Sequence, residues 1–329
     1  MGQKKLTLGN AIAIVAIFLL CVFSFLGIWW REGNLMKAIL ISLGMAVLEG
    51  LILYTLVTAK QKDRGNRIWF PIEMVLVLAF FGVCCLDAKF GGTRSMWSYM
   101  IGRDQLSAAY TLDMQAVDSY VEAYHKELGN AFDNAQTQVA AYLKNPKKVT
   151  ENKAGENIKE YVKQMGDGKN NLKAYYKGIN GRVNDYSVTE DIAKYKSEKK
   201  IESFNLSMLG NIAKSVSGYG EAVKGYIDDK QAMNTLLNNA MEIPNIPEAD
   251  RNGRYSYSEV YKFSCLGSAP VTNNLTTKMG ELDNGVAGWI VFILLNALVF
   301  FNYLVTRRTI SVGMIYTTIY KGNNYGRSL

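Results

Sequence analysis

Four long apolar segments with almost no charge constrain this chain more than any other feature. No charged residue lies between Lys5 and Arg31, a stretch of 25 positions. Three further stretches follow the same pattern: 22 positions with one Glu between Lys37 and Lys60, 19 positions with one Glu between Arg67 and Asp87, and 23 uncharged positions between Asp283 and Arg307. A helix needs about 20 apolar residues to cross a bilayer. The sequence therefore predicts four transmembrane helices, at residues 6–30, 35–59, 68–87 and 286–306.

The first apolar segment is predicted to stay in the mature protein as a signal anchor. Its run is longer than the apolar core of a secretory signal peptide, which spans about 7–15 residues. It also ends in Trp29-Trp30-Arg31-Glu32 rather than in the small residues of a cleavage site.

Basic residues flank the four segments on alternate sides. Residues 88–286 hold 25 Lys/Arg and 24 Asp/Glu, which leaves 12 of the 37 basic and 5 of the 29 acidic residues elsewhere, a net charge of +7. Ten of these twelve fall at 4–5, 60–67 and 307–327. The basic excess thus belongs to the membrane flanks, and we expect no nucleic-acid partner.

These clusters predict an orientation in the cell membrane, because cytoplasmic loops are enriched in Lys and Arg. Residues 1–5, the loop 60–67 and the tail 307–329 are expected in the cytoplasm. Residues 88–286 are expected in the periplasm or outside the cell.

We expect this extracytoplasmic part to be a large helical domain, so that the fold class is an all-α membrane protein. Two stretches keep heptad spacing, which favours a coiled-coil-like bundle. They predict an antiparallel pair of long helices at about 104–144 and 207–243, with residues 146–206 at the distal tip. The seam residues are Met114, Val117, Val121, Tyr124, Leu128, Ala131, Ala135, Gln138 and Tyr142, and then Leu209, Ile212, Val216, Tyr219, Val223, Tyr226, Lys230, Met233, Leu237 and Ala240.

Tyrosine and alanine are frequent in both seams, where a stable coiled coil prefers Leu and Ile. Two interpretations are open. The seam is an ordinary bundle core, or it is completed by a partner from another chain. In the second case Tyr124, Tyr142, Tyr219 and Tyr226 are the candidate binding residues.

Residues 244–285 follow a different pattern, because three prolines interrupt any long helix there. An alternation of apolar side chains predicts a strand: Tyr255, Tyr257, Tyr261, Phe263 and Cys265. We expect a small membrane-proximal collar of β or irregular structure, formed as a short hairpin or as an edge strand paired with a neighbouring subunit.

No residue pattern indicates catalysis. The chain has one histidine, His125, and no Gly-rich phosphate loop, nucleophile elbow or zinc-ligand spacing. We therefore expect no enzyme activity, no cofactor and no metal.

Polar residues inside the predicted spans are the more specific feature. A carboxylate at the bilayer centre costs about 2.5–3.5 kcal/mol on insertion scales, so Glu49 and Glu73 need compensation. Glu49 and Asn296 each precede a cytoplasmic basic residue by 11 positions, which predicts a shared depth. Glu73, Asn302 and Asn10 are predicted to form a second layer nearer the cytoplasm.

Three interpretations of these polar residues are open: a proton or cation relay, interhelical hydrogen bonds that hold the bundle together, or contacts with a partner's membrane helix. Two functions follow. The first is a non-enzymatic scaffold or sensor subunit whose outer domain binds a partner or stimulus. The second is an ion-coupled transport or energising subunit that uses Glu49. For either function we expect the lipid bilayer, further copies of the chain or other membrane subunits as partners.

Overall fold

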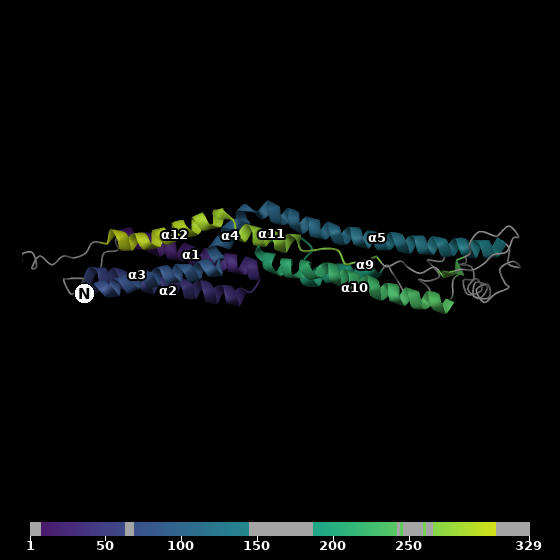
Figure 1. The fold of residues 1–329 in the computed structure, drawn as a ribbon, viewed down its shortest axis with the longest axis horizontal. Coiled ribbons are helices and arrows are strands. Elements are labelled where there is room, and N and C mark those ends of the chain that lie inside the picture. The colour runs from purple at the N-terminus through teal and green to yellow at the C-terminus, as the bar shows by residue number, and fades with distance from the viewer. Residues whose placement is uncertain are drawn as a thin grey trace, which may run out of the picture. The chain divides into compact units, whose positions relative to one another are not determined.

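A computed structural model describes residues 8–62, 69–144, 187–241, 244–245, 259–260 and 266–306, and nearly all of them are helical (Figure 1). The chain divides into two compact units. The span unit comprises Met1–Ser107, Phe204–Asn211 and Thr276–Leu329, and the long-helix unit comprises Ala108–Ser203 and Ile212–Leu275.

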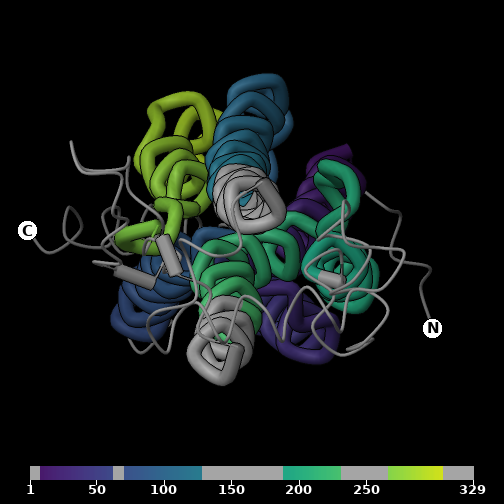
Figure 2. Tube along the Cα trace, turned by 90° about the vertical axis from the view of Figure 1, so that its right-hand side faces the viewer, coloured from purple at the N-terminus to yellow at the C-terminus, as the bar shows by residue number. Residues whose placement is uncertain are grey.

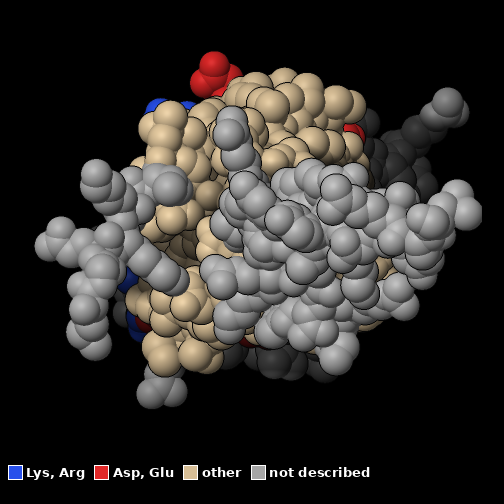
Figure 3. Space-filling model, turned by 90° about the vertical axis from the view of Figure 1, so that its left-hand side faces the viewer, with Lys and Arg blue, Asp and Glu red and all other residues tan. Residues whose placement is uncertain are grey.

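The span unit contains four helices that are long and apolar enough to cross a membrane, as the sequence predicts. They are α1 (Leu8–Glu32), α2 (Leu35–Lys62), α3 (Trp69–Phe90) and α12 (Val286–Val305). Many of their apolar side chains are exposed, which suits contact with lipid. Figure 3 views one face of the molecule, on which most described atoms belong to uncharged residues. These features indicate a membrane protein.

Helix α1 lies at the centre of the span unit and packs against α2 and α12, while α2 also packs against α3. The core combines small and large residues, which lets the helices approach closely. It consists of Ala13, Ala16, Leu20, Leu53, Phe80, Leu295 and Val299.

A short helix, α4 (Gly92–Ile101), also belongs to this packed unit and lies against α1 and α12. Gly91, at φ 67°, separates it from α3. A Cβ atom on Gly27 would lie 1.7 Å from the Gly92 carbonyl oxygen, so α1 and α4 touch through their backbones. The sequence predicted that the extramembrane domain begins at residue 88. Within that predicted domain, α4 packs beside two of the apolar helices, because glycines on each side allow close contact.

The long-helix unit is built on α5 (Arg103–Lys144) and α10 (Leu209–Met241). The 3-10 turn η2 (Leu206–Met208), which precedes α10, belongs to the span unit. Helix α9 (Ser187–Lys199) lies beside α5 and α10, and Figure 2 shows these helices end-on. Lys196 of α9 forms an ion pair of 3.4 Å with Asp118 of α5, and Tyr195 stacks on Tyr219 of α10 at 5.6 Å between ring centroids.

The position of α9 corrects the predicted distal tip at 146–206. Residues 187–203 run back along the first half of α5 because their apolar face, which includes Val188, Ile192 and Ile201, is buried there. Residues 145–186 of the predicted tip lie outside the described residues.

The predicted collar also needs a correction, because residues 274–283 form a helix, α11 (Asn274–Asp283). The buried Asp113 of α5 caps its first turn. Asp113 Oδ1 accepts hydrogen bonds from the backbone and side chain of Asn274, at 3.1 and 2.8 Å, and Oδ2 accepts one from the Leu275 backbone at 3.0 Å. Such a cap satisfies amide groups that a helix start leaves unbonded.

Two strands of two residues each pair antiparallel in the same region, with Pro244 opposite Val260. These are β1 (Pro244–Asn245) and β2 (Glu259–Val260). The alternating apolar residues from Tyr255 to Cys265 lie outside the described residues.

Candidate functional site

Two carboxyl side chains face one small cavity inside the span unit. Glu49 of α2 and Asp87 of α3 are only 1% and 3% exposed. The cavity has a volume of about 10 Å³, close to the smallest space that holds one water molecule. Its other lining residues are Leu20, Cys21, Ser24, Ser42, Met45 and Ala46.

Helical spacing explains why these side chains meet. Ser42 and Glu49 are seven residues apart, which is close to two turns and places both on one face of α2. Cys21 and Ser24 share a face of α1 at a spacing of three. Asp87 belongs to the last turn of α3, just before Gly91 ends the helix.

Hydrogen bonding distinguishes the two acids. The Ser24 hydroxyl donates to Asp87 Oδ1 at 3.4 Å. Within the described part of the chain, Glu49 Oε2 is buried and has no hydrogen-bond partner. The Ser42 hydroxyl donates to the Ala38 carbonyl at 2.7 Å. Among the described residues, one oxygen of the Glu49 carboxyl group is therefore buried without a hydrogen bond, while Asp87 has Ser24 as a partner.

Sequence reasoning missed Asp87, because a charge at the end of an apolar segment is usually a residue of the membrane flank. It also missed Ser24 and Ser42. The available signal was that both serines lie within the long apolar segments, with Ser42 at a helical spacing from Glu49 and Ser24 at a helical spacing from Cys21.

The second predicted acid, Glu73, has a different environment. It is 1% exposed, and the Tyr303 hydroxyl donates to its Oε1 at 2.5 Å. Lys60 Nζ donates to the Tyr303 carbonyl at 2.7 Å and lies 4.3 Å from the centroid of that ring. Glu73 is thus held by a polar cluster that includes Tyr303, a residue the sequence did not single out.

Among the predicted asparagines, Asn302 donates to Asn10 Oδ1 at 2.9 Å, so the structure brings these two together. Asn296 is not part of the Glu49 cavity. Its amide donates to the Phe292 carbonyl at 3.0 Å, and its Oδ1 lies 3.1 Å from the sulfur of Cys84. The predicted pairing of Glu49 with Asn296 is therefore replaced by a pairing of Glu49 with Asp87.

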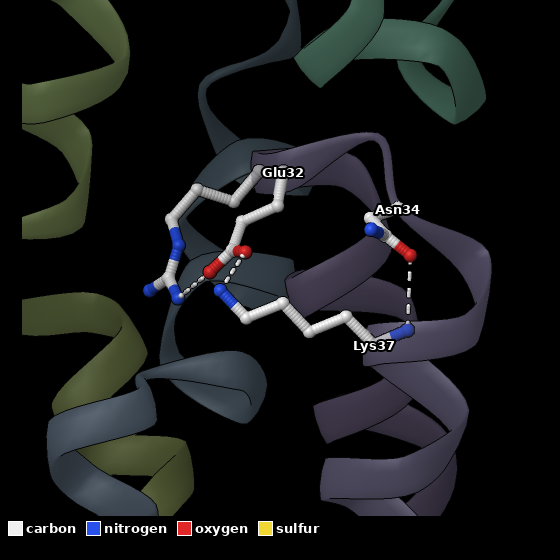
Figure 4. A network of polar contacts seen from close by, with 4 residues as sticks. Glu32, Asn34 and Lys37 are labelled. Carbon is white, nitrogen blue, oxygen red and sulfur yellow. Dashed lines mark hydrogen bonds and ion pairs between the residues drawn. The ribbon is translucent and has the colours of Figure 1, made fainter.

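A cluster of charges closes the turn between α1 and α2 (Figure 4). Glu32 accepts a hydrogen bond from Arg31 at 3.0 Å and forms an ion pair with Lys37. The Asn34 side chain accepts from the Lys37 backbone at 3.0 Å and so caps α2. These contacts explain the local turn without a ligand.

The candidate seam tyrosines lie within the long-helix unit. Tyr124 and Tyr219 are buried, and Tyr226 is half-buried. Burial, followed by the charge of Asp118, raises the pKa of Tyr219. The Tyr142 side chain lies outside the described part. Helix α9 covers Tyr219 through Tyr195, which supports the bundle-core interpretation of this part of the seam.

Metal-ligating residues do not converge in the part of the chain that the structure describes, where no group of three or more His, Cys, Asp or Glu is placed to hold an ion. His125 Nε2 lies 3.3 Å from the Thr189 hydroxyl. Cys21, Cys84 and Cys85 are free thiols.

No family model matches the chain, and neither a curated protein nor a solved structure matches it. The chemistry of the site is therefore the basis for inferring function.

Proposed function

We propose that this chain is an ion-coupled membrane subunit in which Glu49 and Asp87 hold an exchangeable proton. The observation that supports this most directly is the shared cavity of two buried carboxyl groups, one of which has an oxygen without a hydrogen-bond partner in the described structure. A purely structural role predicts the opposite, because a group that holds helices together should be hydrogen-bonded.

The physical chemistry of such a pair favours proton exchange. Two ionised carboxylates in one site repel each other, and each loses solvation on burial. A shared proton relieves both penalties, and the two groups then titrate as a unit. The pair thus has two states that differ by one proton and one charge, which is the minimum that coupling to an ion gradient requires.

The cavity suits a proton better than a larger solute. Its volume of about 10 Å³ admits about one water molecule, and the Ser24 hydroxyl already bonds one of the acids. A bare monovalent cation is the second species that carboxylate and hydroxyl oxygens would accept. The two are separated experimentally below.

A second candidate function is the scaffold or sensor subunit. The bundle of α5, α9 and α10 supports it, since such helical units present long faces to partners. In the orientation proposed from the basic clusters, this unit stands outside the cytoplasm. The two functions are compatible if a partner bound there alters the protonation of the carboxyl pair.

The test uses the full chain with the subunits that co-purify from its native membranes. The complex is reconstituted in vesicles that contain a pH-sensitive dye, and a membrane potential is imposed. We expect proton movement that Glu49→Gln and Asp87→Asn each reduce at least tenfold. Glu73→Gln is the matched control, since Glu73 is equally buried but has Tyr303 as a partner.

Two results would change the proposal. Sodium movement that depends on Glu49, without proton movement, would assign a cation instead. Proton movement that survives both Glu49→Gln and Asp87→Asn would refute the proposed role of the pair. The co-purified partners would then favour the scaffold function.

A further inference from the structure

Two arginine side chains come together at one end of the span unit. Arg31 lies in the last turn of α1, and Arg94 lies in the first turn of α4. Gly91 separates α3 from α4, and a Cβ atom built on it would lie 3.0 Å from Arg31 Nη1 and 3.1 Å from Arg94 Nη2. The two guanidinium groups therefore reach the same small region beside Gly91.

The separation of these groups follows from the two distances. Since both nitrogens lie within 3.1 Å of one point, they are at most about 6 Å apart, a range at which two unit charges repel each other appreciably. The Arg31 side chain is 24% exposed, and Arg94 is half-buried. An anion that contacts both groups would relieve this repulsion.

The carboxylate next to Arg31 is already shared by two cations. Glu32 Oε1 accepts a hydrogen bond from Arg31 Nη2 at 3.0 Å, and Glu32 Oε2 forms the ion pair with Lys37 (Figure 4). In the described part of the chain no ion pair involves Arg94, and its Nε is buried without a hydrogen-bond partner. Glu32 therefore leaves Arg94 without a counter-charge.

A second acid, Asp283, lies in the same neighbourhood, because Asp283 and Arg31 both act on Tyr99. Among the described residues it forms no ion pair with either arginine. Two carboxylates thus stand against three cations, which are the two arginines and Lys37. This corner of the span unit has an excess of positive charge.

The contacts that hold Arg94 in place do not use its hydrogen-bond donors. Its Cζ atom lies over the ring of Trp289, 4.7 Å from the centroid, in a cation–π contact. A Cβ atom on Gly288 would lie 2.8 Å from Arg94 Cγ, so the stem of the side chain packs on the start of α12. A guanidinium carries five N–H donors in a planar fork. Helix α12 thus positions the fork and leaves its donors for another group.

The arginine pair lies where three apolar helices end. Helix α1 ends at Glu32, α3 ends at Phe90 and α12 begins at Val286. All three are long and apolar enough to cross a membrane, so their shared end marks a membrane boundary. Trp289 fits this position, because tryptophan is enriched at the level of the lipid headgroups. In the orientation predicted from the basic clusters, this is the extracytoplasmic boundary.

We propose that Arg31 and Arg94 bind the phosphate group of an anionic phospholipid. The guanidinium fork matches phosphate oxygens, with charge-assisted hydrogen bonds of about 2.7–2.9 Å, so that one phosphate group reaches both side chains. The excess positive charge favours an anionic headgroup over a zwitterionic one. Soluble phosphate offers the same chemistry, and the experiment separates the two sources. The site does not depend on the proton function proposed above.

Equilibrium binding of radiolabelled ligands to the detergent-solubilised full chain tests the site. The probes are short-chain phosphatidylglycerol, short-chain phosphatidylcholine as the zwitterionic comparison, and inorganic phosphate as the soluble source. Arg94→Gln removes one guanidinium, and Arg94→Lys keeps the charge but loses the planar fork. Arg103→Gln is the matched control, since it makes the same change at an exposed arginine at the start of α5.

We expect the unmodified chain to bind phosphatidylglycerol at least tenfold more tightly than phosphatidylcholine. Arg94→Gln should remove this preference, Arg94→Lys should weaken it, and Arg103→Gln should leave it unchanged within about twofold. The conservative Arg94→Lys variant keeps the test decisive if Arg94→Gln fails to fold.

Phosphatidylglycerol binding that is the same in the unmodified chain and in both Arg94 variants would overturn the site. Arg94-dependent binding of inorganic phosphate, without binding of phosphatidylglycerol, would overturn the lipid as its source. Release of a co-purified protein by Arg94→Gln, with lipid binding unchanged, would overturn the lipid in favour of an acidic partner chain. None of these measurements involves proton movement, so their outcome is separate from that of the Glu49 variants.

Discussion

Replacing the two buried glutamates by methionine is expected to change stability in opposite directions. Glu49 and Glu73 are equally buried at 1% exposure, both lie in apolar helices, and methionine has a similar volume. The difference is in their hydrogen bonds. Glu49 Oε2 has no partner among the described residues, while Glu73 accepts a 2.5 Å bond from Tyr303.

The magnitudes follow from these contacts. Glu49→Met removes a buried polar group without a partner, which should raise the free energy of unfolding by about 1–3 kcal/mol. Glu73→Met removes the acceptor of a hydrogen bond to a carboxylate, which should lower it by about 1.5–3 kcal/mol. The same chemical change at the same burial thus separates the two variants by several kcal/mol.

The assay is unfolding in mixed micelles with increasing SDS, followed by circular dichroism and tryptophan fluorescence. We expect the transition of Glu49→Met at a higher SDS fraction than that of the unmodified chain, and the transition of Glu73→Met at a lower one. A shift of both variants in the same direction would refute the reasoning. The Glu49 carboxyl would then have a stabilising partner, and its role would be structural.

Three further predictions concern the rest of the fold. Asp113→Ala should lower the free energy of unfolding by about 3 kcal/mol in the same assay, because it removes the buried cap of α11. The control Asp118→Ala, at a side chain 64% exposed, should lower it by less than about 1 kcal/mol. Gly27→Val should destabilise the span unit by at least about 3 kcal/mol, because its Cβ would meet the Gly92 carbonyl oxygen at 1.7 Å; a normal SDS transition would contradict that contact. Burial, followed by the charge of Asp283, raises the pKa of Tyr99 in the folded state above its ordinary value of 10.0. The free energy of unfolding should therefore hold below pH 10 and fall as the pH rises further. Tyr99→Phe should reduce this alkaline loss of stability, and an unchanged pH profile in that variant would argue against the shift.

The membrane helices could be predicted from sequence because their determinant is local. An apolar run of about 20 residues with at most one charge has few other uses. The four observed helices begin and end within about four residues of the predicted spans. Helix α4 could not be predicted in the same way. Its sequence is too short and too polar to span, and it joins the unit only because glycines at 27 and 288 make room for it.

The candidate site was half predictable. Glu49 stands out in an apolar segment, but its partner Asp87 lies at the end of one, where sequence reasoning assigns a charge to the flank. The depth argument paired Glu49 with Asn296, since depth alone ignores the direction in which a side chain points around its helix. Helix α11 was missed because its cap, Asp113, is distant in the sequence. Helix α9 was placed at the tip because packing against α5 and α10 is likewise nonlocal.

The central claim is that Glu49 and Asp87 share an exchangeable proton. Infrared difference spectroscopy of the reconstituted full chain tests it most directly, by comparing spectra across a pH step in H₂O and D₂O. The account predicts a carboxylic acid C=O band that changes with pH, shifts in D₂O and disappears in both Glu49→Gln and Asp87→Asn. A spectrum without such a band, or one in which the band persists unchanged in both variants, would contradict it.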